Sequence, residues 1–374
     1  MTNKAIMELT KTIKSRYHKA SRKEKSKILD EFCANTDLHR KSAIRTFNNF
    51  KTKKSPPGRK KKYPRECELI IVKVWNLLDN ICPERFHSKI AEHVDKVAAS
   101  SSQKMSKLVC EMSLSTVKRV IAKQPRKDLR SRNRSSRKKG YTDVPVNPYL
   151  RKAIKFGSIG LDLVEHNGGD LSGEFCRSIT LADVHTLWTT NAVSPNGMQN
   201  NIELAFDKAI SRFPDSDKAE IHPDNENALI ATSLLKSKIK KLKIHCVTRS
   251  RAYKKNDNCH VEERNLERVR KHVGFKRYTK KHMNLLNNLY SLLDDYSNFF
   301  IPSVKLSKKV YDKHTHKLVK RVYDEARTPY ERVLGDDTVD TLAKMKLTQK
   351  YRTLDIVELR DQIDKILHKL RSSS

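Results

Sequence analysis

The stretch "FGSIGLDLVEH", Phe156–His166, decides the fold of this chain, because the side-chain pattern changes there from helical to extended. An apolar run of this length, followed closely by Gly-Gly, predicts a β-strand. One acid, Asp162, lies in the middle of the run. A carboxylate buried without a partner is costly, so Asp162 should have a cation, hydrogen bonds or a metal ion beside it.

The segments that follow predict an α/β layer with a mixed sheet. No G-x-G-x-x-G or Walker loop interrupts them, so the sequence gives no support to a nucleotide cofactor. Two further extended runs are followed by alternating helices and short strands, read from "EFCRSITLADVH" (174–185), "TLWTTNAV" (186–193), "MQNNIELAFDKAISRF" (198–213), "AEIHPDN" (219–225), "ALIATSLLKSKIKK" (228–241) and "LKIHCVT" (242–248), with a helix after residue 261.

Upstream of this layer the sequence predicts two helix-turn-helix units. In the first, Ser21 and Glu24 have capping-box spacing ahead of an apolar helix face. After the turn "ANTD" comes a short helix with Ala43, Ile44 and Phe47 inward, and its outward cations are Arg40, Lys41 and Arg45. In the second unit the helices are read from "ELIIVKVWNLLDNI" (68–81), "FHSKIAEHVDKVAA" (86–99) and "SLSTVKRVIAK" (113–123), and the last of them exposes Lys118 and Arg119. In such units the last helix lies in the DNA major groove.

The chain of 374 residues has a formal net charge of +35, which favours a polyanionic partner, above all nucleic acid. Two basic stretches, at 51–66 and 125–150, separate the helical units from each other and from the α/β layer; the first includes Arg59. Each can be a solvated linker, a DNA contact, or both. The domains expected are therefore 1–50, 67–124, 151–300 and a C-terminal module at 301–374, with linkers at 51–66 and 125–150.

No apolar run is long enough to span a membrane, and no signal peptide is evident. Seven irregularly spaced cysteines predict free thiols in a reducing, bacterial cytoplasm, near the nucleoid. The tail "LDIVELRDQIDKILHKL" (354–370) predicts a helix with Ile356, Leu359, Ile363, Ile366 and Leu370 on one face. That face fits a helix docked on its own protein, and self-association is the alternative.

Three acids fall on neighbouring predicted elements. Asp162 lies within a strand, Asp224 ends another, and Glu262 begins a helix. If they converge at one end of the sheet, their mutual repulsion and oxygen ligands favour two divalent ions, Mg²⁺ or Mn²⁺. Two such ions promote phosphodiester chemistry. The 43 Asp and Glu residues offer many triples, so only placement on the strands favours this one.

The loop before Glu262 is basic. "RSRAYKKNDNCHVEERN", residues 249–265, begins with Arg249, Arg251, Lys254 and Lys255, which would hold a DNA strand beside the metal site. A mixed-charge surface helix is the simpler alternative, since Glu near a helix N-terminus is favoured by the helix dipole. Asp183 is expected to be structural, paired with Lys or Arg, whereas Glu165, Asp170 and Glu263 are expected to be solvated.

From about residue 155 to 335 the sequence resembles the catalytic core of integrase-type DDE transposases, insertion-sequence enzymes related to retroviral integrases. The segments that carry the resemblance are "LDLVEHNGG", "GEFCRSITLADVHTLW", "PDN", "RSRAYKKNDNCHVEERN", "DDYSNFFIPS" and "RTPYERVL". It implies an RNase H-like fold and a catalytic, metal-binding triad of Asp162, Asp224 and Glu262. Asn265 fits the V-E-x-x-N pattern of the family, which implies an orienting or DNA-proximal role.

The resemblance implies a transposase that cuts element ends and joins them to target DNA, assembled as a homo-oligomer on DNA. Two departures stand out: Glu226 follows Asp224-Asn225 where the family has glycine, and Ala252 stands where proline is usual. A turn that needs positive φ would disfavour Glu226. The alternative is therefore a catalytically impaired, sequence-specific DNA-binding protein derived from a transposase; a metal-dependent nuclease is a third reading.

Overall fold

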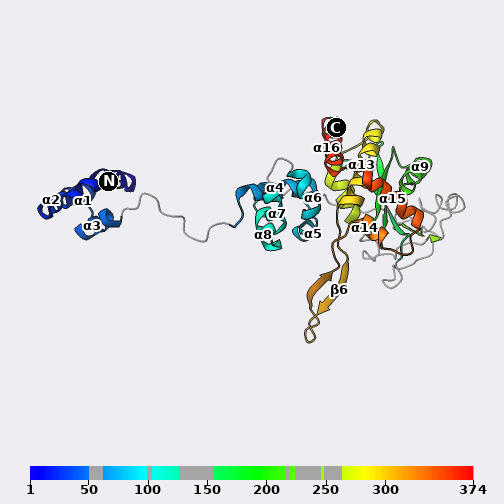
Figure 1. Ribbon diagram of the computed structural model, residues 1–374. Helices are drawn as coiled ribbons and strands as arrows, with labels where there is room; N and C mark the ends of the chain where they lie inside the picture. The colour runs from blue at the N-terminus through cyan, green and yellow to red at the C-terminus, as the bar shows by residue number, and fades with distance from the viewer. Residues whose placement is uncertain are drawn as a thin grey trace. The chain divides into compact units, whose positions relative to one another are not determined.

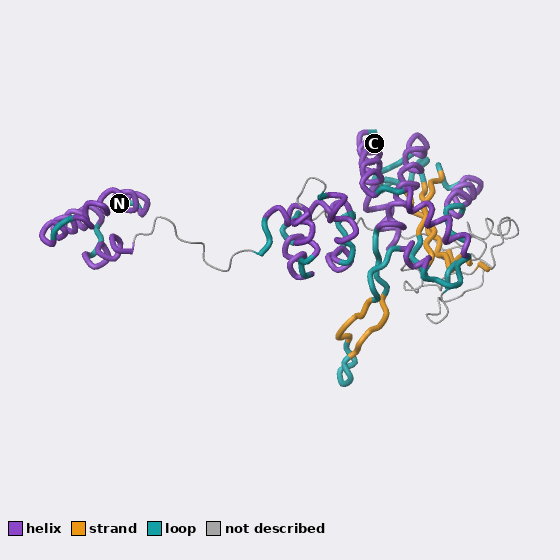
Figure 2. The backbone as a smooth tube through the Cα atoms, in the orientation of Figure 1, coloured by secondary structure: helices purple, strands orange, loops and turns teal. Residues whose placement is uncertain are grey.

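The structure is a computed structural model that describes residues 1–49, 62–98, 103–125, 155–215, 220–223, 246–247 and 263–373. Its backbone is traced in Figures 1 and 2. The chain divides into two compact units, Met1–Lys62 and Tyr63–Ser374. A helix-rich chain with a mixed sheet is confirmed, and the multidomain layout is compatible with it. The helix predicted over 228–241 lies outside the described residues.

The first unit is a cluster of three helices, α1 (Asn3–Lys19), α2 (Arg22–Thr36) and α3 (Arg40–Asn49). The predicted capping box is present, since the Ser21 amide donates to Glu24 Oε2 at 2.9 Å and the Glu24 amide to Ser21 Oγ at 3.4 Å. Tyr17 of α1 stacks on Phe47 of α3 with ring centroids 4.6 Å apart, so α1, which was not predicted, completes the core. The buried residues of this core are Tyr17, Ile28, Leu29, Phe32, Ala43 and Phe47.

The second unit begins with a bundle of short helices: α4 (Arg65–Leu77), α5 (Pro83–His87), α6 (Ile90–Val97), α7 (Gln103–Cys110) and α8 (Leu114–Ile121). The single helix predicted over 86–99 is wrong, because the chain breaks at Ser88 and Lys89. Buried Lys89 places its Nζ 2.6 Å from Glu92 and 2.5 Å from Glu331, a residue 242 positions away. This long-range ion pair, which no local pattern reveals, fixes the break.

The sheet has the strand order β3-β2-β1-β4-β5, with β1 (Ser158–Glu165) at its centre. It is mixed: β1 pairs antiparallel with β2 (Arg177–Asp183) and parallel with β4 (Glu220–Pro223). Strand β3 (Thr189–Ser194) pairs antiparallel with β2, and β5 (Cys246–Val247) pairs parallel with β4. Helix α9 (Gln199–Ile210) packs against β2 and β3.

Helix α13 (Met283–Phe300) covers the open edge of the sheet. Three of its polar side chains, Asn298, Asp294 and Asn287, accept the backbone N–H groups of Thr189, Asn191 and Val193 on β3, at 3.0, 3.1 and 3.1 Å. Asn298 also donates to the Thr189 carbonyl at 2.7 Å. The helix therefore satisfies the hydrogen-bonding groups of an edge strand that would otherwise be exposed or buried unpaired.

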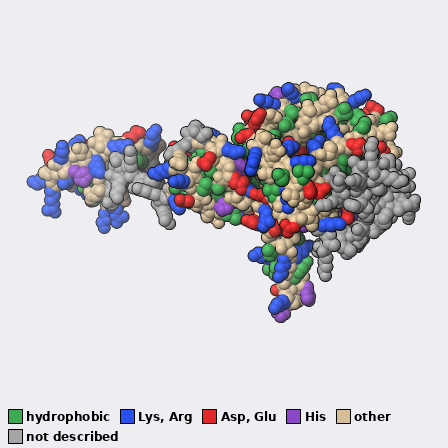
Figure 3. Space-filling model, turned by 45° about the vertical axis from the view of Figure 1, so that its right-hand side comes forward, with side chains coloured by type: hydrophobic (Ala, Val, Ile, Leu, Met, Phe, Trp, Pro, Cys, Tyr) green, Lys and Arg blue, Asp and Glu red, His purple; other side chains and the backbone are tan. Residues whose placement is uncertain are grey.

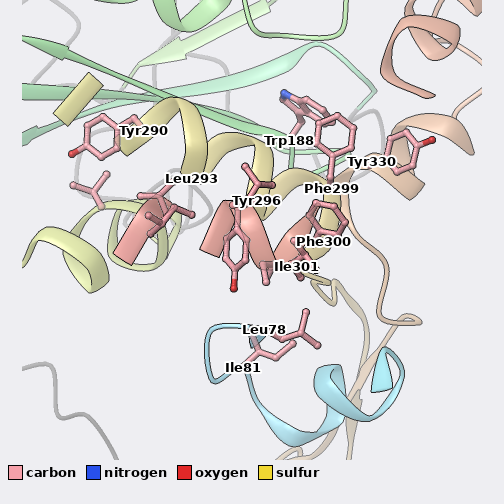
Figure 4. Close-up of a cluster of buried hydrophobic side chains, with 14 of the residues drawn as sticks. Leu78, Ile81, Trp188, Tyr290, Leu293, Tyr296, Phe299, Phe300, Ile301 and Tyr330 are labelled. Carbon is pink, nitrogen blue, oxygen red and sulfur yellow. The ribbon is translucent and has the colours of Figure 1, made fainter. Parts of the chain in front are cut away.

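Other side chains of α13 pack against the end of α4 and against the C-terminal helix. Figure 4 shows Tyr296, Phe300 and Ile301 lying toward Leu78 and Ile81, from the end of α4. The Tyr296 hydroxyl donates to the Leu77 carbonyl at 2.6 Å. Helix α16 (Ile356–Ser372) packs along α13 and buries Ile356, Leu359, Ile363, Leu367 and Leu370. The docked alternative for this helix is thus confirmed, with Leu367 buried and Ile366 only partly buried.

The remaining elements of this unit connect the sheet to its C-terminal part. A π-helical segment, η3 (Asn265–Arg270), continues into α12 (Lys271–Val273), and a short 3₁₀ turn, η4 (Lys280–His282), precedes α13. After α13 come the hairpin β6 (Leu306–Tyr311) and β7 (Leu318–Tyr323), then α14 (Pro329–Leu334) and α15 (Thr341–Thr353). Of the helices in the described ranges, none has the length and apolar character needed to cross a membrane.

Candidate active site

Asp162 lies on the central strand of the sheet and is half-buried. Its register partner on β2 is Thr180, whose own partner on β3 is Asn191. Opposed residues of antiparallel strands share a face, so these three polar side chains form a row across the sheet. The Asn191 amide group donates to Thr180 Oγ1 at 2.7 Å. The Asp162 carboxylate is therefore built into a polar row and not isolated among apolar side chains.

The π-helical segment η3 brings a second group to this carboxylate. Asn265 Nδ2 donates to Asp162 Oδ2, and the backbone amide of Leu163 donates to Asp162 Oδ1 at 2.8 Å. Asn265 is only 7% exposed, and its Oδ1 is a buried acceptor with no hydrogen-bond partner among the described residues. π-helical turns are uncommon and often occur at functional sites. The segment thus holds Asp162 by one end of an amide and leaves a buried oxygen at the other.

Ion pairs fix η3 from its other side. Glu267 accepts Arg85 Nη1 and Nη2 of α5, both at 3.1 Å, and Arg264 Nη1 at 2.7 Å. Burial opposes ionisation of Glu267, but Arg264, Arg85 and Arg268 overcome it and hold the pKa of this carboxyl at about 2. The helical bundle at 63–125 is therefore anchored to the segment that carries Asn265.

Strand β4 ends beside the strand that carries Asp162. Its last described residue, Pro223, is the register partner of Leu161. Asp224 is the next residue in the chain, and it lies outside the described residues, as does Glu262. The described chain resumes at Glu263, which is exposed. Of the predicted triad, the structure therefore describes Asp162 itself, together with the residue before Asp224 and the residue after Glu262.

Oxygen donors around Asp162 suit a hard divalent cation. Its carboxylate and Asn265 Oδ1, which has no partner in the part of the chain that the structure describes, are the kind of ligands that Mg²⁺ and Mn²⁺ take. Within the described ranges, no three or more His, Cys, Asp or Glu side chains are grouped so that they could hold a metal. The metal site predicted here includes Asp224 and Glu262, which lie outside these ranges.

The other acids near the sheet have structural partners. The prediction that Glu165 is solvated is wrong, because Arg177, opposite it on β2, lies 3.2 Å from its carboxylate. Asp183 is structural as predicted, but its hydrogen bonds come from the Gly157 amide at 2.8 Å and from Thr186, not from Lys or Arg. Asp170 and Glu263 are exposed, as predicted.

Asp294 is the buried acid that sequence reasoning missed. Arg212 Nη2 lies 2.7 Å from Asp294 Oδ2, and the backbone N–H of Asn191 donates to the same oxygen. Burial raises the pKa of Asp294 to about 7 against the opposing effect of Arg212. Its position seven residues after Asn287 and four before Asn298, on one face of the helix, was the available signal for an edge-capping role.

The residues predicted to bind DNA fall into three groups. Lys41, Arg45 and Arg119 are exposed. Arg40 is bonded within its own unit to Asp30 and to Ser26 Oγ, and Lys118 Nζ lies 2.6 Å from Glu84. Outside the described residues lie Arg59, Arg249, Arg251, Lys254 and Lys255. DNA contact by any of them stays a prediction.

Comparison with known proteins gives relatives but no family. No protein-family model matches the chain. Over 329 residues it is 29% identical to an uncharacterised protein, y4rM, of Sinorhizobium fredii (strain NBRC 101917 / NGR234), covering 81% of this chain and 88% of that protein. A solved structure, the simian T-cell lymphotropic virus intasome in complex with PP2A regulatory subunit B56 gamma, matches with a TM-score of 0.31 and 14% identity, over 61% of this chain and 72% of the matched chain. That TM-score does not establish a shared fold.

Proposed function

We propose that this chain is a DNA transposase of the integrase type, with an RNase H-like core and a catalytic triad of Asp162, Asp224 and Glu262. The observation that carries the proposal is the contact between Asn265 and Asp162. It ties the central strand to a segment that begins directly after Glu262, and strand β4 stops beside Leu161 directly before Asp224. Both observations support a triad in which Asp224 and Glu262 would lie near the strand that carries Asp162.

The residues have separate roles in this proposal. Asp162 would share two Mg²⁺ or Mn²⁺ ions, and Asp224 and Glu262 would each take one. When bound, such ions activate the attacking oxygen and stabilise the leaving oxygen of a phosphodiester. Asn265 holds the Asp162 carboxylate in a fixed orientation, as partners of metal ligands do. Arg249, Arg251, Lys254 and Lys255 would bind the phosphates of the DNA strand.

The overall reaction exchanges phosphodiester bonds. Water first cleaves the strand at the element end and leaves a 3′-hydroxyl. That hydroxyl then attacks a phosphodiester of the target duplex, forms a new bond to phosphorus and releases the target 3′-oxygen. No energy-rich cofactor is needed because one phosphodiester replaces another. The helical units would recognise the ends, and a homo-oligomer would hold two ends together.

The test is strand transfer with pre-cut duplexes made from the DNA that flanks the gene on either side. The intact protein with Mn²⁺ should yield a joined product, whereas Asp162→Asn and Glu262→Gln should yield none and still bind the duplex. Glu263→Gln is the matched control, because Glu263 is adjacent and exposed, and it should keep its activity. Hydrolysis without a joined product would indicate a nuclease instead.

A second candidate is a DNA-binding protein whose core does not catalyse. The residue that favours it is Glu226, which stands where the resembling enzymes have glycine. Duplex binding by the intact protein without any joined product, in Mg²⁺ and in Mn²⁺, would favour this reading. Recovery of joining in Glu226→Gly would then identify the turn as the cause.

A further inference from the structure

The hairpin of β6 and β7 extends away from the rest of its unit (Figures 1 and 2). From Leu306 to Tyr323 no side chain is buried. An isolated two-stranded hairpin is marginally stable in water, because it has no third strand or helix to cover it. A surface of this kind is expected to gain stability from a partner.

Cations dominate this hairpin. Between residues 306 and 323 the only acid, Asp312, accepts hydrogen bonds from the Thr315 amide at 2.7 Å and the His314 amide at 3.0 Å, and so shapes the turn. Lys309 on β6 lies directly opposite Arg321 on β7. Like charges in this position repel, so the pair destabilises the free hairpin. The six cations of the segment are Lys308, Lys309, Lys313, Lys317, Lys320 and Arg321.

Apolar side chains flank these cations. Tyr311 and Tyr323 are 52% and 50% exposed, and Val319 is 67% exposed. The register pairs Tyr311 with Leu318 near the tip and Leu306 with Tyr323 at the base. In Figure 3 this projection carries blue cations, green apolar side chains and purple histidines at its end. Charge and exposed apolar surface therefore lie on one narrow ribbon.

The base of the hairpin is held rigidly near the candidate active site. The Lys305 amide donates to Asp324 Oδ1 at 2.5 Å, and Arg332 Nη1 lies 2.7 Å from Asp324 Oδ2. Just before the hairpin, Ser303 accepts a hydrogen bond from Arg264 Nη1 at 3.3 Å. Arg264 directly precedes Asn265, which contacts Asp162. The hairpin therefore starts beside the segment that holds the proposed catalytic acid.

Three explanations of this surface can be compared. Lysine on an exposed strand discourages pairing with other strands, which explains isolated lysines but not Lys309 facing Arg321 or the exposed tyrosines. A second copy of the chain is disfavoured by its net charge of +35. Duplex DNA fits both features, since phosphates neutralise the paired cations and a two-stranded ribbon fits the major groove.

We propose that the β6–β7 hairpin is a DNA-binding arm. Lys308, Lys309, Lys320 and Arg321 contact phosphates of a duplex, and Tyr311 and Tyr323 pack against its sugars or base edges. The proposal rests on the proposed function only in taking DNA as the ligand of the chain. It assigns binding to residues that the sequence patterns did not single out.

The test is fluorescence anisotropy of the full chain with a 40-base-pair duplex of arbitrary sequence, in EDTA and at several salt concentrations. The arm variant replaces Lys308, Lys309, Lys320 and Arg321 with Gln. Its matched control, K346Q/R352Q/K365Q/K369Q, also removes three Lys and one Arg, but from exposed positions on α15 and α16. At 0.15 M salt the arm variant should bind about tenfold or more weakly, and its slope of log affinity against log salt should be shallower by about 3.

Two further readouts keep the result decisive. The double variant Y311A/Y323A should weaken binding without changing the salt slope, because it removes no charge. The thermal midpoint of the arm variant should be no lower than that of the intact protein, since the variant removes no buried contact and relieves the repulsion between Lys309 and Arg321. The assay needs no metal, so it is independent of whether strand transfer occurs.

Equal losses in the arm variant and its control would overturn the proposal, because net charge alone would then explain them. Unchanged DNA binding would overturn it as well. In that case, a change in the molar mass measured by light scattering would identify the hairpin as a protein contact. Lost binding to vesicles that contain anionic lipid would instead identify it as a membrane contact.

Discussion

Asn265 connects the polar row on the sheet to the segment that follows Glu262. Its amide can donate to Asp162 from one end only, and packing around the π-helical segment keeps the side chain 7% exposed. A carboxylate that must bind metal in one geometry depends on such a partner. For the proposed metal site, the way in which Asn265 orients the Asp162 carboxylate therefore matters more than what this one hydrogen bond adds to the stability of the fold.

Removing this amide should impair the reaction but not the fold. We predict that Asn265→Ala lowers the rate of strand transfer by about 10- to 100-fold, as is typical for partners of metal ligands. Leu266→Ala, at a neighbouring residue that is 50% exposed, is the control and should be nearly neutral. The single-turnover rate at saturating Mn²⁺ measures the effect. Equal rates for both variants would show that Asn265 does not orient Asp162.

Glu267 gives the chain a specific sensitivity to acid. Its pKa of about 2 lies below the ordinary value of 4.5, so its stabilising effect is complete above pH 4.5 and is lost as the pH falls toward 2. At pH 7 we predict that Glu267→Gln lowers the free energy of unfolding by about 2–4 kcal/mol, since it leaves Arg85 and Arg264 without their partner. Denaturant unfolding from pH 3 to 7 should show this difference shrinking as the pH falls. A difference that does not vary with pH would contradict the ion pair.

At the scale of single elements, helix α13 replaces a missing strand. A strand at the edge of a sheet exposes its N–H and C=O groups. In β3, backbone N–H groups donate hydrogen bonds to Asn287, Asp294 and Asn298 of α13. These residues interrupt the mainly apolar buried side of the helix, at spacings that place them on one face. Polar residues on that face therefore have a structural function and need no catalytic one.

The edge contact predicts a large cost for one small change. Asn298→Ala leaves the N–H and C=O of Thr189 unpaired and should lower the free energy of unfolding by about 1–3 kcal/mol. Asn288→Ala, on the exposed side of the same helix, should change it by less than about 0.5 kcal/mol. Urea unfolding of both variants provides the comparison. Similar small effects would mean that solvent, not Asn298, satisfies the strand edge.

Local sequence patterns predicted most helices and strands but not the contacts between distant elements. Alternation and helical periodicity predicted β1, β2, β3, α9 and α16 near their observed positions. The helix α1 was missed although Ile6, Leu9, Ile13 and Tyr17 recur at helical spacing. The break at Lys89 depends on Glu331, and the partner of Glu165 is Arg177 on another strand. Contacts between distant residues decide such details, so a single sequence cannot reveal them.

The candidate site shows the same division between what the sequence predicts and what only the structure shows. An acid in an apolar run indicated Asp162, and the structure shows its partners, Leu163 and Asn265. The role of Asn265 was implied only by resemblance to a family, because its own sequence neighbourhood does not reveal which strand it meets. The anchoring of η3 by Arg85, from a helix about 180 residues away, had no sequence signal at all.

At the scale of the whole molecule, the second unit joins the helical bundle, the sheet and the C-terminal helix around a few buried charges. Asp79, at the end of α4, lies 2.6 Å from Lys271 Nζ and 3.2 Å from Arg360 Nη1, and Arg85 reaches Glu267. These pairs connect the bundle that is proposed to bind DNA with the segment that positions Asp162. In the proposed function, the binding of DNA and the positioning of Asp162 would therefore depend on one connected body.

The central claim is that Asp162, Asp224 and Glu262 hold divalent metal together. The most direct measurement replaces Mg²⁺ with Fe²⁺ and maps the cuts that ascorbate and peroxide produce in the protein backbone near the bound iron. The account predicts cuts close to residues 162, 224 and 262 in one protein, all suppressed by excess Mg²⁺ and all absent in Asp162→Asn. Cuts near one of the three positions only, or a pattern that persists in Asp162→Asn, would contradict it.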